Sequence, residues 1–114
     1  APERDAAPAP NAQASRATAA SPAPARMPLA ISNNAVVAVD TADGPRMYSF
    51  LGLGPGRTHA DISRAALEYD PRTGKWTRLE DVPVERGRLA ATAAAAQGAV
   101  FLFGGYTVDP DGHE

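Results

Sequence analysis

Two stretches of this chain follow one pattern, and this repeat limits the possible folds more than any other feature. Residues 47–53 read Met-Tyr-Ser-Phe-Leu-Gly-Leu, and residues 100–106 read Val-Phe-Leu-Phe-Gly-Gly-Tyr. Each stretch is an apolar run that ends in glycine, and Gly52 and Gly105 lie 53 residues apart. A period near 50 indicates an array of similar units, each of which buries its apolar surface against its neighbours.

Short strands joined by tight turns are predicted between and around the two copies. Asp70 and Pro71 open a turn that Gly74 closes, because glycine adopts positive φ at little cost. Residues 75–79 then alternate in and out at period two, as a half-buried strand does. Four such strands joined in chain order form an antiparallel meander. We predict strands at 35–39, 47–51, 65–69 and 75–79, a turn cluster at 41–45, and a further strand at 99–103.

A meander repeated with this period predicts an all-β fold, in which each four-stranded antiparallel meander is one blade of a β-propeller. We expect residues 29–80 to form one complete blade and residues 81–114 to form the first half of a second. Repeat folds generally need about three units for stability. The chain is therefore expected to be a fragment of a larger propeller, whose remaining blades are its partners.

Residues 89–96 allow two interpretations. Their alanines favour a short helix by intrinsic propensity. However, the two-residue connection Gln97-Gly98 suits a β-hairpin, and an apolar strand follows it at once. The first strand of a propeller blade also lies nearest the axis, where only small side chains fit. We therefore predict a strand.

The first 28 residues form a separate zone that is rich in alanine and proline. They contain 11 Ala and 6 Pro, and Thr18 is their only β-branched residue. Such a segment buries too little apolar surface to offset its ordering entropy, so we predict a disordered tether. The chain begins with Ala1 instead of Met, which suggests that an upstream segment was removed. We expect a periplasmic or secreted protein.

The overall composition excludes several classes of function. The formal net charge is −2, so no strong field selects nucleic acid or an anionic membrane. The longest apolar run, residues 89–96, is far below the roughly 18 residues that a membrane span needs. The chain has no cysteine, which excludes disulfides and thiolate chemistry.

From about Met27 onward the chain resembles kelch repeats. The matching features are the Gly104-Gly105 pair after an apolar strand, Tyr69 before an Asp-Pro turn, Trp76 seven residues later, and Arg88 before the small-residue strand. The first copy departs from the pattern, since it has Leu51-Gly52 where a kelch repeat has two glycines. The resemblance implies a kelch-type propeller.

Within kelch proteins, the chain is similar to the bacterial N-acetylneuraminate epimerases, which are periplasmic sialic acid mutarotases. The similarity lies in the order of the pieces: a Pro-rich lead-in, the loop Gly52-Leu53-Gly54, Lys75-Trp76-Thr77, Arg88 and the double-glycine strand. It implies a sugar isomerase that needs an acid–base pair, an arginine for the sugar carboxylate and no cofactor. The alternative is a non-catalytic kelch module that binds a protein or a glycan, because a fold alone does not choose between these roles.

The order of the strands predicts where a ligand binds. The connections after the first and third strand of each meander gather on one face and are short, whereas those after the second and fourth strands gather on the opposite face. We call this opposite face, formed by residues 52–64, 80–88 and 106–114, the long-loop face. Long loops on a rigid scaffold commonly carry binding residues. The candidate binding residues on it are Arg88, Arg86, Arg57 and His59.

Each candidate has a structural alternative. The guanidinium of Arg88 matches a carboxylate in shape and charge, but it also suits the loop carbonyls of a neighbouring blade; Arg86 is a weaker candidate for the same role. His59 is a possible general acid or base, or simply an exposed loop residue.

Two further motifs are not assigned a function. Glycines 52, 54 and 56 lack the Gly-Lys-Ser/Thr ending and the following helix of a phosphate-binding loop. Residues 109–114 carry carboxylates at a spacing like that of a calcium loop, but Pro110 occupies the second position. We interpret this segment as a charged turn and expect no metal site.

Overall fold

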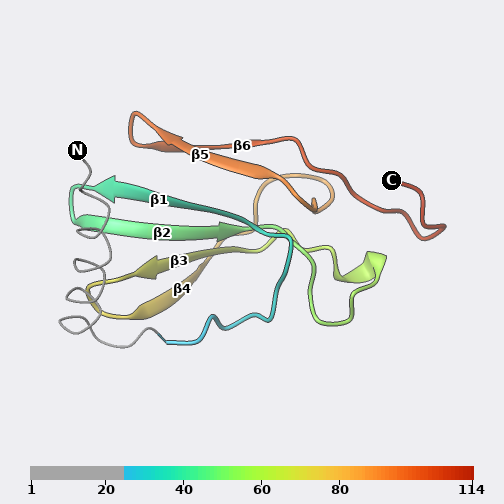
Figure 1. The fold of residues 1–114 in the computed structure, drawn as a ribbon, viewed down its shortest axis with the longest axis horizontal. Coiled ribbons are helices and arrows are strands. Elements are labelled where there is room, and N and C mark those ends of the chain that lie inside the picture. The colour runs from blue at the N-terminus through green and yellow to red at the C-terminus, as the bar shows by residue number, and fades with distance from the viewer. Residues whose placement is uncertain (1–24) are drawn as a thin grey trace, which may run out of the picture.

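The structure, a computed structural model, describes residues 25–114, which form two antiparallel sheets joined by loops (Figure 1). The described part contains one 3-10 turn, η1 (His59–Asp61), and no α-helix, so the all-β prediction is confirmed. The predicted tether falls on residues 1–28, of which residues 1–24 lie outside the described part. The strands are β1 (Ala35–Thr41), β2 (Gly44–Phe50), β3 (Ala66–Asp70) and β4 (Lys75–Leu79) in the first sheet, and β5 (Thr92–Ala96) and β6 (Ala99–Phe103) in the second.

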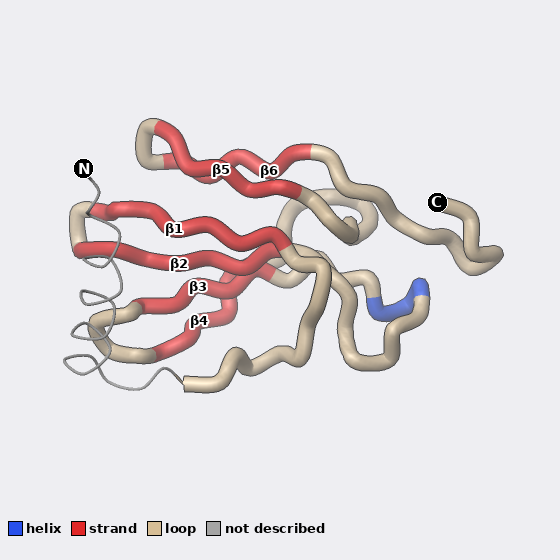
Figure 2. The backbone as a smooth tube through the Cα atoms, viewed as in Figure 1, coloured by secondary structure: helices blue, strands red, loops and turns tan. Residues whose placement is uncertain are grey.

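The first sheet is the predicted meander, with strand order β1-β2-β3-β4 and every neighbouring pair antiparallel (Figure 2). The turn between β1 and β2 is shorter than predicted, because Thr41 and Gly44 still pair. The Thr41 hydroxyl donates to Gly44 O at 2.7 Å and accepts from Asp43 N–H at 3.2 Å. This side chain closes the turn and lets both strands continue further than the turn residues indicated.

The alanine-rich segment forms strand β5, as predicted, and pairs with β6 across Gln97-Gly98. The strand begins three residues later than expected. Ala90 has a φ of 59°, a left-handed conformation that does not belong to an extended strand. The regular pairing of β5 with β6 therefore starts only at Thr92.

The two units share more than a sequence pattern, because the same backbone bridge recurs in each. Ser32 and Leu53 exchange two hydrogen bonds, of 2.9 and 2.7 Å, just outside the β1–β2 hairpin. Leu89 and Tyr106 exchange two, of 2.7 and 3.0 Å, just outside the β5–β6 hairpin. The second hairpin thus repeats the first together with its flanking residues.

The residues after β2 and β6 also share one conformation. Leu51 and Gly52 have φ values of 64° and 110°, and Gly104 and Gly105 have 67° and 84°. A Cβ atom at Gly52 would lie 2.7 Å from Ser32 O, and one at Gly105 would lie 2.9 Å from Leu89 O. The second position of the pair therefore requires glycine, whereas the first accepts leucine without a change of backbone.

The β5–β6 hairpin lies over one side of the first sheet, which we call its near side. Phe50 lines a groove together with Leu102 of the hairpin and so points to the near side, and Tyr48, two residues earlier on β2, points the same way because side chains alternate along a strand. Of the strands of the first sheet, β1 alone contacts the hairpin, which lies next to β1 in Figure 1. The groove has a volume of about 450 Å³, with Phe50 on one wall and Leu102 of β6 on the other.

The opposite side of the first sheet, its far side, is half covered by residues 25–34. Trp76 Nε1 donates to Ala25 O at 3.0 Å, and Asn34 Nδ2 donates to Ser49 Oγ at 2.7 Å. The Trp76 ring is tilted against Tyr69 with centroids 4.9 Å apart. Leu67, on the same side, is the most buried large residue at 1 % exposure.

The short turns and the long loops lie at opposite ends of the molecule, as expected for an antiparallel meander. The β1–β2, β3–β4 and β5–β6 turns gather at one end of the molecule, and the long loops gather at the other (Figure 1). Among the described residues no helix has the length and apolar character needed to cross a membrane.

Candidate functional site

A polar pocket of about 280 Å³ lies on the long-loop face, where the three long loops meet. Its walls come from the loop after β2, the loop after β4 and the segment after β6. Two arginines and a histidine share it with a single carboxylate. The lining residues are His59, Ile62, Arg64, Glu85, Arg86, Gly87 and Thr107.

The first wall is ordered by a capped 3-10 turn. The Asp61 carboxylate accepts from Thr58 N–H at 3.5 Å and from its hydroxyl at 3.4 Å. Gly54 N–H donates to Asp61 O at 2.9 Å and ties the turn to the start of the loop. His59 begins this turn and is exposed. Its imidazole is therefore presented on an ordered segment.

The second wall is fastened to the first by backbone contacts. Val82 N–H donates to Arg64 O at 2.8 Å, and Gly52 N–H donates to Arg88 O at 3.0 Å. Gly87 is buried against Ser63: a Cβ atom there would collide with the Ser63 carbonyl oxygen and lie 2.8 Å from its carbon. Only glycine allows this approach.

The third wall is joined to the second by Arg86, whose Nη2 donates to Val108 O at 3.2 Å. This bond stretches from the loop after β4 to the segment after β6. Arg86 thus helps to assemble the pocket that it lines.

The pocket is lined by more positively than negatively charged side chains. Arg64 lies 3.8 Å from Asp81, but that carboxylate is also shared with Arg78 at 3.2 Å. Arg64 also donates to Val84 O at 3.4 Å. Within the pocket itself, Glu85 is the one carboxylate beside two guanidinium groups. The arrangement suits a small anion, since arginine pairs well with carboxylates.

The four residues singled out from the sequence do not all meet. His59 and Arg86 line this pocket together. Arg57 lies on a neighbouring pocket of about 220 Å³, beside Leu53 and residues 30–32. Arg88 is half-buried, and its Nη1 donates to Arg86 O at 3.4 Å. Its guanidinium therefore bonds a loop carbonyl, although the carbonyl belongs to its own loop and not to a neighbouring blade.

Two residues of the pocket, Arg64 and Glu85, were placed on the long-loop face by the sequence but were not among the candidates. They lie on different loops, and no spacing rule connects them. The available signal was their position: Arg64 stands just before a predicted strand, and Glu85 stands beside Arg86.

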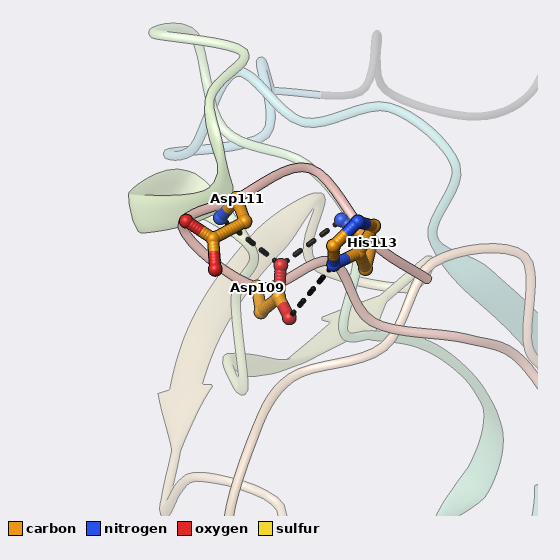
Figure 3. A group of neighbouring side chains, drawn as sticks. All are labelled: Asp109, Asp111 and His113. Carbon is orange, nitrogen blue, oxygen red and sulfur yellow. Dashed lines mark hydrogen bonds and ion pairs between the residues drawn. The ribbon is translucent and has the colours of Figure 1, made fainter.

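The charged turn at the end of the chain has a clear structural role for Asp109 (Figure 3). Asp109 Oδ1 accepts from Asp111 N–H at 3.0 Å and from His113 N–H at 2.9 Å, and Oδ2 lies 3.8 Å from His113 Nδ1. Potential ligand atoms of these three residues lie within 4.8 Å of one another. The bonds of Asp109 close a turn, as the sequence interpretation proposed.

No protein-family model matches the chain, and no curated protein matches its sequence.

Proposed function

We propose that this chain is part of an exported kelch-type propeller that binds an acidic sugar on its long-loop face. The observation that carries the proposal is the pocket in which Arg64 and Arg86 face an opening shared with His59 and Glu85. The recurrence of one hairpin with its flanking bridge supports the propeller part, because propellers are built from such units.

The sugar carboxylate is the group that the pocket would recognise. A guanidinium donates parallel hydrogen bonds to both carboxylate oxygens, and such charge-assisted bonds are stronger than neutral ones. The Arg86–Val108 bond holds the arginine in place before a ligand arrives, which lowers the entropy cost of binding. Glu85 would accept from sugar hydroxyls.

Mutarotation is the candidate reaction, and it is favoured because His59 and Glu85 line the same pocket. Anomer exchange of a sialic acid opens and recloses the hemiketal ring. A base removes the proton from the anomeric hydroxyl while an acid protonates the ring oxygen, and the bond between that oxygen and the anomeric carbon breaks. Reclosure on the other face of the carbonyl reverses both transfers. Non-catalytic binding of a glycan or a protein is the alternative.

Binding is tested by titrating the chain with N-acetylneuraminic acid and, separately, with the neutral sugar N-acetylmannosamine. We expect the acid to bind more tightly. Arg64→Gln and Arg86→Gln should each weaken its affinity by about tenfold or more, since a hydrogen bond to a charged group contributes roughly 1.5–3 kcal/mol. Arg72→Gln removes an exposed arginine at the opposite end and is the matched control. Equal affinity for both sugars, or an equal loss with the control, would contradict the proposal.

Catalysis is tested by following the α-anomer of N-acetylneuraminic acid by NMR. We expect exchange faster than the spontaneous rate, with the excess lost in His59→Asn and Glu85→Gln. A spontaneous rate combined with retained, carboxylate-dependent binding would assign the chain to the non-catalytic class.

A further inference from the structure

Arg64, one of the two arginines of the polar pocket, shares a carboxylate with an arginine outside the pocket. Asp81 lies between the two guanidinium groups: its Oδ2 is 3.8 Å from Arg64 Nη2, and its Oδ1 is 3.2 Å from Arg78 Nη2. Arg64 lines the pocket, whereas Asp81 and Arg78 do not. The three side chains therefore form a chain of alternating charges that ends at the pocket.

The two contacts of the Asp81 carboxylate differ in kind. Arg78 Nη2 donates a hydrogen bond of 3.2 Å to Asp81 Oδ1. The 3.8 Å between Asp81 Oδ2 and Arg64 Nη2 is too long for a hydrogen bond, so that contact is electrostatic alone. Hydrogen bonds between ionised groups are the strong form of this interaction. Asp81 is therefore held mainly by Arg78 and neutralises Arg64 only in part.

The backbone places the Asp81 carboxylate within reach of Arg64. Val82 N–H donates to Arg64 O at 2.8 Å, which brings Asp81, the preceding residue, beside Arg64. The Arg64 guanidinium also donates from Nη1 to Val84 O at 3.4 Å. A guanidinium carries five N–H donors, so some remain for a ligand in the pocket. A stronger pairing with Asp81 would occupy more of them.

We propose that Arg78 is a positioning residue for the acidic ligand, because it keeps the Asp81 carboxylate from pairing fully with Arg64. This inference rests on the proposed function, since it concerns the affinity of the same pocket. A ligand carboxylate and the Asp81 carboxylate compete for one guanidinium. The hydrogen bond from Arg78 to Asp81 leaves Arg64 available to the ligand.

Two variants that each remove one charge should change the affinity in opposite directions. Asp81→Asn removes the competing carboxylate but keeps its shape, so we expect N-acetylneuraminic acid to bind about two- to fivefold more tightly, as for one exposed ion pair. Arg78→Gln releases the carboxylate toward Arg64, so we expect binding to weaken by about the same factor. Isothermal titration calorimetry would measure both. Weaker binding by Asp81→Asn, or unchanged binding by Arg78→Gln, would overturn the proposal.

Double variants show whether the effect passes along the chain of charges. If Arg78 acts through Asp81, Arg78→Gln should change the affinity little in a protein that already carries Asp81→Asn. If Asp81 acts through Arg64, Asp81→Asn should not raise the affinity of the Arg64→Gln protein. The titrations are made at about 0.15 M salt, where distant exposed charges are largely screened. Effects of full size in both double variants would contradict the proposed order.

Matched controls remove the same charges at the opposite end of the molecule. Asp43→Asn in the β1–β2 turn and Arg72→Gln in the β3–β4 turn should leave the affinity unchanged. The neutral sugar N-acetylmannosamine has no carboxylate that competes with Asp81, so its affinity should be the same in every variant. An equal change for both sugars would show that the shape of the pocket had changed, and would contradict the proposal.

A measurement without ligand separates this proposal from the proposed function. Hydrogen exchange of the Arg64 guanidinium, followed by NMR, should become slower in Arg78→Gln, because Asp81 is then free to accept from Arg64. Unchanged exchange would overturn the role of Arg78 even if the sugar binds. Absence of sugar binding to the unaltered chain, with slower exchange in Arg78→Gln, would instead overturn the proposed function alone.

The variants are expected to keep the fold. The side chains of Arg64, Asp81 and Arg78 are between 42 % and 54 % exposed, and substitutions at exposed positions usually change stability little. Circular dichroism would check each protein. If either single variant fails to fold, Asp81→Ser and Arg78→Met remove the same charges and repeat the experiment.

Discussion

Leu51 has the same left-handed backbone conformation as Gly104, with φ values of 64° and 67°. A non-glycine residue in this conformation is destabilised by roughly 1–2 kcal/mol. The Leu51 side chain is 3 % exposed, and its burial contributes about 1.5–3 kcal/mol. The first unit thus keeps the conformation of a double glycine while placing a core residue in it.

Replacing Leu51 with glycine separates these two effects. Leu51→Gly relieves the backbone cost but loses the buried side chain and leaves a cavity, so we expect a net loss of about 1–3 kcal/mol in the free energy of unfolding. Urea denaturation would measure it. Gly104→Ala is the reciprocal variant: its Cβ would meet open space, so it should cost only the backbone term of roughly 1–2 kcal/mol. A stabilised Leu51→Gly protein would show that burial is the smaller effect.

Gly87→Ala should loosen the pocket. Its Cβ would collide with the carbonyl of Ser63 and lie 2.9 Å from Ile62 O, so the loops after β2 and β4 must separate. We expect a loss of about 1–3 kcal/mol in stability and faster amide exchange at Val82, which bonds Arg64 O across the same junction. Gly54→Ala is the control, since its Cβ would lie no closer than 3.4 Å to any neighbour. Unchanged exchange at Val82 would contradict this account.

Tyr48 gives the sheet a predictable response to alkaline pH. Burial, followed by the 2.8 Å hydrogen bond that its hydroxyl donates to Glu68, raises the pKa of the phenol. The folded state therefore favours the neutral form. The resulting stability is fully present below the unfolded pKa of about 10 and is lost as pH rises through the higher folded pKa.

Tyr48→Phe tests this response. At neutral pH we expect a loss of about 0.5–1 kcal/mol for the hydrogen bond, because the pair is only partly buried. Above pH of about 10 the difference between the two proteins should shrink, since only the unaltered chain loses the Tyr48 contribution. Urea midpoints measured across this range would show it, and parallel curves for the two proteins would contradict the assignment.

Asp109→Ala should open the turn at the end of the chain without unfolding the sheets. Asp109 Oδ1 accepts from the backbone of Asp111 and His113, and these amides should lose their protection from hydrogen exchange. Exposed turns contribute little to global stability, so the urea midpoint should stay within about 0.5 kcal/mol of its original value. Pro110→Ala keeps the carboxylate and is the matched control. A large loss of global stability would show that the turn is part of the core.

The sequence predicted the strands well because their signals are local. The turn at Asp70–Gly74 and the hairpin at Gln97-Gly98 are short, and each fixes the strands beside it. The same signals misplaced the turn between β1 and β2, where the Thr41 hydroxyl changed the outcome.

The pocket was only partly predictable, because it depends on contacts between distant residues. The strand order was enough to place His59 and Arg86 on one face. The Val82–Arg64 backbone bond, which brings the two loops together, has no sequence signature. Nor does the bond that turns Arg88 back onto the Arg86 carbonyl.

The indole of Trp76 is the only one in the chain, and its N–H is bonded to the carbonyl of Ala25. The emission of this single fluorophore therefore reports whether residues 25–34 are docked on the sheet. A red shift with intact strands would reveal release of that segment, without any label having been attached.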